Sequence, residues 1–206
     1  MYTPVNFKIE DSEVIRSFIR ANSFGILFSR EVNGGFHDTH VPMLVSDDLT
    51  SITGHIARAN PQWKSWEADA EVKTVFHGPH GYVSPLYYES DFNVPTWNYS
   101  AVSVSGSVSI ASDRGEQTEI MRELVGFYEK TQPTRWKLDE ADSRFMKLFD
   151  AIVFFSIEIT GIEAKFKLSQ NKSAEDRAKV IQCLSETGSR HDADVAAMMR
   201  EAKDLP

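Results

Sequence analysis

Two short stretches of the sequence combine side chains that bind anions, and the first is GHIARANPQW (54–63). Arg58 and Asn60 precede Pro61, a residue typical of the first turn of a helix. The guanidinium of Arg58 is a planar set of donors that suits phosphate oxygens. Asn60 can cap the helix, and free N–H groups at a helix start favour an anion. A surface arginine beside a structural cap is the alternative interpretation.

The second stretch is KFKLSQN (165–171), which follows the apolar run AIVFFSIEITGIEA. If residues 157–168 form a strand, Lys165 and Lys167 lie on one face of it. Ser169, Gln170 and Asn171 then supply donors and acceptors in a turn. The cluster fits a phosphorylated or otherwise acidic ligand, and a solvated strand end is the alternative.

A third stretch, VPTWNYS (94–100), could hold a flat heterocycle. On a strand, Trp97 and Tyr99 point one way, and Thr96 and Asn98 point the other. Aromatic rings with an amide can stack on such a ring and bond its edge. Packing of these rings against the protein itself is the alternative.

Other chemistries find little support in the sequence. The six histidines are scattered, and the close pair in HGPH (77–80) matches no metal-ligand spacing, so we expect no metal site. Motifs of serine hydrolases, zinc proteases and P-loop proteins are absent from the sequence. Hydrolysis is therefore not predicted.

Composition favours a globular protein of one large domain, or of one domain with an appendage. The chain has 206 residues, 41% hydrophobic and 25% charged, with a formal net charge of −8. That charge argues against a generally basic nucleic-acid surface. The single cysteine, Cys183, cannot form an internal disulfide. No secretory signal or apolar span of membrane length is visible, so we expect a cytoplasmic protein without a membrane segment.

The elements that position these stretches follow from hydrophobic patterning. Strands are predicted at 24–30, 52–58, 70–78, 99–112 and 151–168, with 24–45 forming a hairpin. Helices are predicted at 11–22, after Pro61, and at 114–130, 139–149, 173–186 and 191–203. Residues 78–99, rich in proline and aromatics, are expected to be irregular. The order predicts an antiparallel barrel with peripheral helices.

Five motifs in one order carry a family resemblance: MYTP with a phenylalanine at position 7, GHIARANPQW, VFHGPHGYVSP, VPTWNY and KLSQNKSAEDR. From Met1 to about Leu184 the chain resembles the PaiB family of FMN-binding negative transcriptional regulators. The resemblance implies a mainly β fold, an antiparallel FMN-binding split barrel, Greek-key-like, with C-terminal helices. Pyridoxamine-phosphate oxidases and flavin reductases have similar folds. Residues 1–170 would form the barrel domain, and 171–206 a helical extension packed on the barrel or on a partner subunit.

The resemblance also implies FMN as cofactor, bound at the interface of a homodimer. Arg58 and Asn60 would hold its phosphate or ribityl chain. The other implied cofactor residues lead into that corner, line the pocket, or approach from the second subunit; they are His55, Ala57, Thr96, Trp97, Asn98, Lys165, Ser169, Gln170 and Asn171.

Three positions depart from the usual family pattern: Asn6 and Ser103 where a histidine is common, and Tyr87 where a tryptophan is common. Two functions therefore stay open, a transcriptional regulator and an FMN-dependent oxidoreductase or flavin reductase. Haem handling is a third, although no histidine is marked as an axial ligand. DNA is a possible partner, but the sequence has no helix-turn-helix signature and its charge disfavours direct contact.

Overall fold

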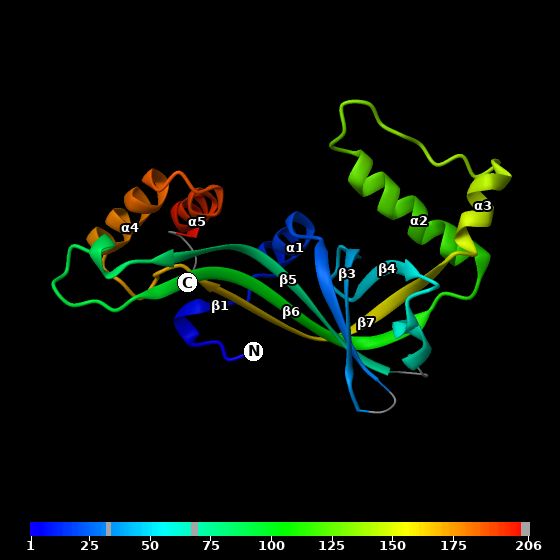
Figure 1. Ribbon diagram of the computed structural model, residues 1–206, viewed down its shortest axis with the longest axis horizontal. Helices are drawn as coiled ribbons and strands as arrows, with labels where there is room; N and C mark the ends of the chain where they lie inside the picture. Colours follow the sequence, from blue (N-terminus) through cyan, green and yellow to red (C-terminus); the bar gives the residue numbers. More distant parts are fainter. Residues whose placement is uncertain (32–33, 67–69, 203–206) are drawn as a thin grey trace. The chain divides into compact units, whose positions relative to one another are not determined.

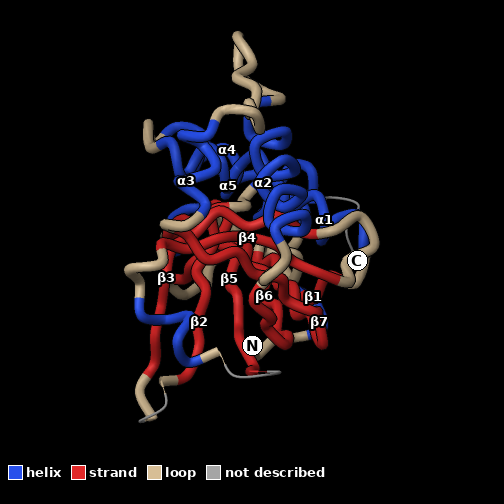
Figure 2. The backbone as a smooth tube through the Cα atoms, turned by 90° about the vertical axis from the view of Figure 1, so that its right-hand side faces the viewer, coloured by secondary structure: helices blue, strands red, loops and turns tan. Residues whose placement is uncertain are grey.

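The computed structural model describes residues 1–31, 34–66 and 70–202 (Figures 1 and 2). The strands are β1 (Lys8–Ile9), β2 (Phe24–Arg30), β3 (Phe36–Val45), β4 (Ser51–Ala57), β5 (Ala70–Val83), β6 (Thr96–Ile110) and β7 (Ile152–Lys167). The α-helices are α1 (Ser12–Ala21), α2 (Arg114–Glu129), α3 (Ser143–Phe149), α4 (Ala174–Glu186) and α5 (Arg190–Glu201). Short 3-10 helices are η1 (Val5–Phe7), η2 (Pro61–Ser65) and η3 (Pro85–Tyr87).

The strands form one sheet in the order β1-β7-β4-β3-β2-β5-β6. Strand β6 also pairs with β7, so the order closes on itself. The ladders of β2 with β3 and β5, of β4 with β3 and β7, and of β1 with β7 are antiparallel. Strands β2 and β3 lie side by side (Figure 2) and confirm the predicted hairpin at 24–45. In their ladder Phe24 is opposite Pro42 and Arg30 is opposite Phe36. The predicted antiparallel barrel with helices around it is therefore confirmed.

Contacts divide the chain into two compact units, and three strands contribute to both. Unit 1 comprises Met1–Phe18, His77–Ser103 and Glu163–Pro206. Unit 2 comprises Ile19–Phe76 and Val104–Ile162. Each unit contains some of the residues singled out in the sequence, so the two are described separately below.

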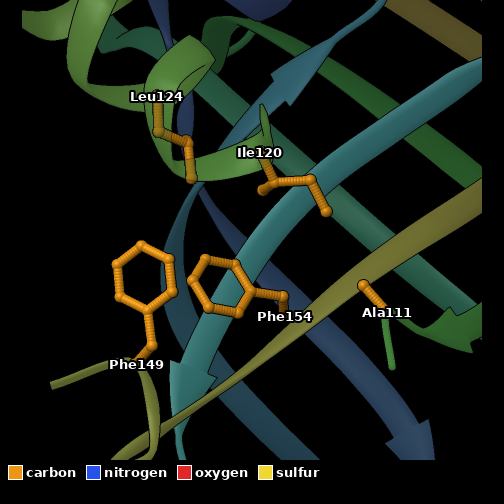
Figure 3. Packing of buried hydrophobic residues seen from close by; sticks show 5 residues of the cluster. All are labelled: Ala111, Ile120, Leu124, Phe149 and Phe154. Atoms are coloured by element: carbon orange, nitrogen blue, oxygen red, sulfur yellow. The ribbon is translucent and has the colours of Figure 1, made fainter. Parts of the chain in front are cut away.

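Helix α2 supplies part of the core of unit 2. Ile120 and Leu124 stand four residues apart, so they lie on one face of the helix and pack on Phe149 and Phe154 (Figure 3). The two phenylalanine rings are 5.2 Å apart between centroids. The helix predicted at 114–130 is therefore confirmed.

Unit 1 contains β1 and parts of β5, β6 and β7, together with α4 and α5, which lie side by side (Figure 1). The buried carboxylate of Asp176, in the first turn of α4, accepts hydrogen bonds from the backbone N–H groups of Glu89 and Ser90 at 2.9 and 3.0 Å. The Ser90 hydroxyl donates to the same carboxylate at 2.8 Å. These bonds fasten the segment after η3 to the helix.

Strand β5 differs from the prediction because it continues through Pro79 to Val83. Proline removes one backbone donor, but its carbonyl remains an acceptor. Gly78 is buried, and a Cβ there would contact the Ser100 hydroxyl and lie 2.7 Å from Phe18 Cε2. This tight packing in unit 1 keeps the chain extended. Strand β6 likewise begins at Thr96, three residues before the predicted start.

Candidate functional site

The end of β4 and the start of η2 form the first candidate site, in unit 2. Asn60 is the N-cap of η2, and its Oδ1 accepts a hydrogen bond from the Gln62 N–H at 2.9 Å. Its Nδ2 donates to Thr39 Oγ1 at 2.8 Å. The predicted cap is confirmed. Because η2 is a 3-10 helix of five residues, its dipole is small, and the main positive charge of this corner is Arg58 itself.

Arg58 joins the end of β4 to the start of β7. Its Nε donates to the Asp150 carbonyl at 2.6 Å, and its Nη2 donates to the Ile152 carbonyl at 2.8 Å. The guanidinium also lies 5.8 Å from the centroid of the Trp63 ring. Arg58 is exposed, and a guanidinium has five N–H groups, so these two bonds do not exhaust its capacity to bind an anion.

His55 and Ala57 precede this corner on β4. Ala57 is exposed at the end of the strand, whereas the His55 ring packs on Phe154 at 5.7 Å between centroids. The His55 Nδ1 atom is buried and has no hydrogen-bond partner among the described residues. Burial lowers the pKa of His55 below its ordinary value. The ring is therefore neutral at neutral pH.

The second candidate site is a pocket of about 210 Å³ in unit 1, where β7 ends. It brings together four of the predicted residues, Thr96, Asn98, Ser169 and Asn171. Its walls also include residues outside the implied cofactor set: Phe7, Tyr88, Val94, Lys172, and Lys167, which the sequence predicted to share a strand face with Lys165. We call it the lysine pocket.

Lys167 and Lys172 make the lysine pocket cationic. The Lys167 ammonium contacts Thr96 Oγ1 and donates to the Trp97 carbonyl at 2.6 Å. Lys172 donates to Asn93 Oδ1 at 2.6 Å, and its ammonium lies 5.0 Å from the centroid of the Tyr88 ring. Burial and then the charges of Lys165 and Lys172 lower the pKa of Lys167. A bound anion would offset that repulsion.

Lys165 lies beside the lysine pocket, but its ammonium is bonded to the N-terminal segment. Only 8% of the residue is exposed, and its ammonium donates to the Tyr2 carbonyl at 3.0 Å. The rings of Tyr2 and Tyr99 lie 5.7 and 5.2 Å from it. These contacts commit Lys165 to holding the N-terminal segment against β6 and β7.

The turn after β7 is shaped by Ser169 and Gln170. Ser169 is buried in a left-handed conformation, with φ of 62°, which non-glycine residues adopt at an energetic cost. Asn98 Nδ2 donates to its hydroxyl at 3.0 Å. Gln170 accepts from the Leu168 N–H and donates to the Phe166 carbonyl. Gln170 therefore closes the turn and does not line the pocket.

Trp97 belongs to a ring cluster outside the lysine pocket. It is 54% exposed, and its ring centroid lies 6.1 Å from Tyr82 and 6.2 Å from His80. His80 is also 4.8 Å from His77 and 5.1 Å from His191. Within 1–31, 34–66 and 70–202, no group of three or more His, Cys, Asp or Glu side chains is placed to hold a metal ion.

Comparison with known proteins places this geometry in a family. Residues 1–161 match a family model described as "Putative FMN-binding domain". The chain belongs to this FMN-binding family. It is also 37% identical, over 98% of its length and 97% of the relative's, to "Protease synthase and sporulation protein PAI 2" of Bacillus subtilis. That match confirms membership of the PaiB family, and FMN is the cofactor that the membership assigns.

Solved structures support the fold. A flavocytochrome, Anf3 from Azotobacter vinelandii, has a TM-score of 0.63 at 17% identity, covering 84% of this chain and 75% of that one. An FAD- and heme-binding protein from Mycobacterium smegmatis has a TM-score of 0.62 at 10% identity, covering 83% and 78%. The split-barrel fold expected from the resemblance is thus confirmed. None of the helices in the described ranges is long and apolar enough to cross a membrane.

The residues present fit a phosphorylated flavin in part at each site. Pockets that enclose a ligand of drug size usually measure roughly 300–1,000 Å³. The lysine pocket, at about 210 Å³, can hold an anionic group or one edge of a ring but cannot enclose all of FMN. Arg58 supplies a second cationic group, in the other unit. Bound flavin would supply one- or two-electron redox chemistry, and the protein would supply orientation and charge.

Proposed function

We propose that this protein is a homodimeric FMN-binding regulator that reduces transcription of its target genes, with FMN held between the subunits. FMN binding is supported by the cationic lysine pocket in a chain of the FMN-binding family. The proposed role in transcription rests on the resemblance to the PaiB repressors. The curated relative's name, which refers to protease synthesis and sporulation, is compatible with it.

Each group of residues has a proposed role. Arg58 and Asn60 hold the phosphate or ribityl chain, and His55 and Ala57 lie on the strand that precedes them. Lys167 and Lys172 of the second subunit bind an anionic group of the same FMN, and the polar wall of the lysine pocket orients the ligand. Trp97, being exposed, offers a face on which the flavin ring can stack. Ser169 and Gln170 keep the turn after β7 in shape, and Lys165 holds the N-terminal segment beside it.

The size and charge of the two candidate sites support a binding site shared between two subunits. The lysine pocket is too small to enclose all of FMN, and Arg58 is an exposed cation outside that pocket. In a twofold dimer, a residue of one subunit that meets a group of the second does so twice, by symmetry. Arg58 of one subunit and Lys167 of its partner would then complete two equal sites.

Flavin titration tests the cofactor site. FMN fluorescence would be followed on wild type, Lys167→Met, Lys172→Met and the matched control Lys130→Met, which lies at the end of α2 outside the pocket. A hydrogen bond to a charged group contributes about 1.5–3 kcal/mol, so each pocket variant should weaken FMN at least about tenfold. Riboflavin, which lacks the phosphate, should be little affected. Equal losses for FMN and riboflavin would contradict phosphate binding here.

Mixing two defective variants tests the dimer. Arg58→Met and Lys167→Met would be co-expressed with different tags and the mixture titrated with FMN. If the site is shared, a mixed dimer has one intact site, so about a quarter of all sites should regain wild-type affinity. No recovery, or a monomer in sedimentation analysis, would refute the shared site. Circular dichroism on each variant would confirm that it folds.

Gene regulation needs a separate test because the net charge of −8 does not favour DNA. A gel shift at moderate salt, with and without FMN, would compare DNA upstream of the protein's own gene with random DNA. Equal affinity for both would count against direct repression.

We further propose a cytoplasmic location, testable by cell fractionation, and a C-terminal extension at 171–206 that follows the barrel domain. Truncation at residue 170 with a melting curve would test that division.

A further inference from the structure

A second pocket, of about 290 Å³, lies in unit 2 and contains none of the residues predicted from the sequence. Its walls include Phe28 and Arg30 of β2, Phe36 of β3 and Lys73 of β5. Ser105 and Gly106 of β6 complete one side. We call it the Arg30 pocket.

The four large side chains of the Arg30 pocket form two cross-strand pairs. Phe28 lies opposite Lys73 in the β2–β5 ladder, and Arg30 lies opposite Phe36 in the β2–β3 ladder. Residues 28 and 30 are two apart on one strand, so they share a face of the sheet, and their partners share it too. Rings and cations therefore alternate across one small surface.

The Arg30 pocket combines an exposed aromatic ring with cationic groups. The Arg30 guanidinium lies 5.4 Å from the centroid of the Phe36 ring, and Phe36 is 67% exposed. The charged side chains of the wall are Arg30, Lys73 and Glu71, a formal sum of +1 in a chain of net charge −8. A guanidinium stacks on planar rings and bonds a carboxylate through two parallel N–H groups.

The side of the pocket at β6 is held in place by close backbone packing. A Cβ at position 106 would contact the Glu158 carbonyl oxygen and lie 2.6 Å from Ile157 Cγ2. Glycine lets β6 and β7 approach this closely. On the β2 side, Ser29 of the pocket wall accepts a hydrogen bond from Gln62 Nε2 at 3.2 Å. Such a pocket is largely formed before a ligand arrives.

We propose that the Arg30 pocket binds a small planar aromatic carboxylate. Its volume lies just below the usual range for pockets that enclose a ligand of drug size, which suits a ligand of one or two rings and excludes a dinucleotide. The carboxylate bonds Arg30 and Lys73, and the ring stacks on Phe28 and Phe36. The site uses residues of unit 2 alone and does not require FMN.

Calorimetric titration of the full chain with benzoate tests this site. Benzamide keeps the ring without the charge, and cyclohexanecarboxylate keeps the charge without the planar ring. Benzoate should bind saturably at one per chain, and each analogue should bind at least about tenfold more weakly. Titrations with and without saturating FMN should give the same benzoate affinity.

Arg30→Met should weaken benzoate at least about tenfold. Arg114→Met is the matched control, because Arg114 also stacks on a ring, that of Phe149 at 5.6 Å, but lies outside the pocket. Lys73→Met provides a second test if Arg30→Met fails to fold. The proposal is overturned by an absence of saturable binding, by equal affinity for benzamide, by equal effects of the Arg30 and Arg114 variants, or by displacement of benzoate by FMN.

Discussion

Replacing Gly106 by alanine should destabilise the protein strongly, because two strands of unit 2 meet at this glycine. The added Cβ would contact the Glu158 carbonyl oxygen and lie 2.6 Å from Ile157 Cγ2, closer than real Cβ contacts allow. The Glu158 carbonyl is backbone in β7, so it cannot turn aside as the end of a flexible side chain could. The strands must separate locally or the new methyl group must be accommodated by strain.

The expected cost lies at the upper end of the range for overpacking, about 3 kcal/mol. For a chain of this size, each kcal/mol lowers the melting temperature by about 2–4 °C, so Gly106→Ala should melt roughly 6–12 °C below wild type. The assay is thermal unfolding followed by circular dichroism, supported by urea denaturation at 25 °C.

Gly161→Ala is the matched control on β7. A Cβ there meets nothing within 4 Å, and the residue is exposed. Because alanine restricts the unfolded chain more than glycine does, this variant should be as stable as wild type or more stable by about 0.4–1 kcal/mol. If Gly106→Ala melts at the wild-type temperature, the inferred close approach of β6 and β7 is refuted. Equal losses of melting temperature in both variants would show a general effect of removing glycine.

Three further predictions concern the titratable residues Lys165, His55 and Asp176. Lys165→Met should lower the free energy of unfolding by about 1–3 kcal/mol because it removes the bond to Tyr2 and the ring contacts; its effect on FMN affinity, measured by fluorescence, should be smaller than that of Lys167→Met. Burial lowers the pKa of His55, so wild-type stability should be complete above pH about 6.5 and should fall as the pH drops from there through the folded pKa. Urea midpoints from pH 5 to 8 should show a smaller slope for His55→Phe. Hydrogen bonds, first that from the Ser90 N–H, lower the pKa of Asp176, so its stabilisation should be present above pH about 3.9 and be lost as the pH falls through the folded pKa. Asp176→Asn weakens the hydrogen bonds that fasten the segment after η3 to α4, so it should speed proteolysis within 84–95 at pH 7. Unchanged cleavage would contradict this fastening role of Asp176.

Local features of the fold could be predicted from the sequence because their causes lie within a few residues. Ile120 and Leu124 are spaced for one helical face, and both are buried. Asn60 caps η2, and Ser173 caps α4 by accepting a hydrogen bond from the Asp176 N–H at 3.1 Å. The five family motifs indicated the split barrel and FMN.

The composition of the pockets depended on contacts between residues distant in sequence. Lys165 and Lys167 are equivalent by strand alternation, but only the tertiary structure shows that Tyr2, 163 residues from Lys165, accepts the Lys165 hydrogen bond and that Lys167 lines the pocket. Lys172 and Tyr88 meet there because the segment after η3 is fastened to α4. The Arg30 pocket exists because the registers of β2 with β3 and β5 place two rings and two cations on one face. Strand register is a property of paired segments, and no single segment encodes its partner's position.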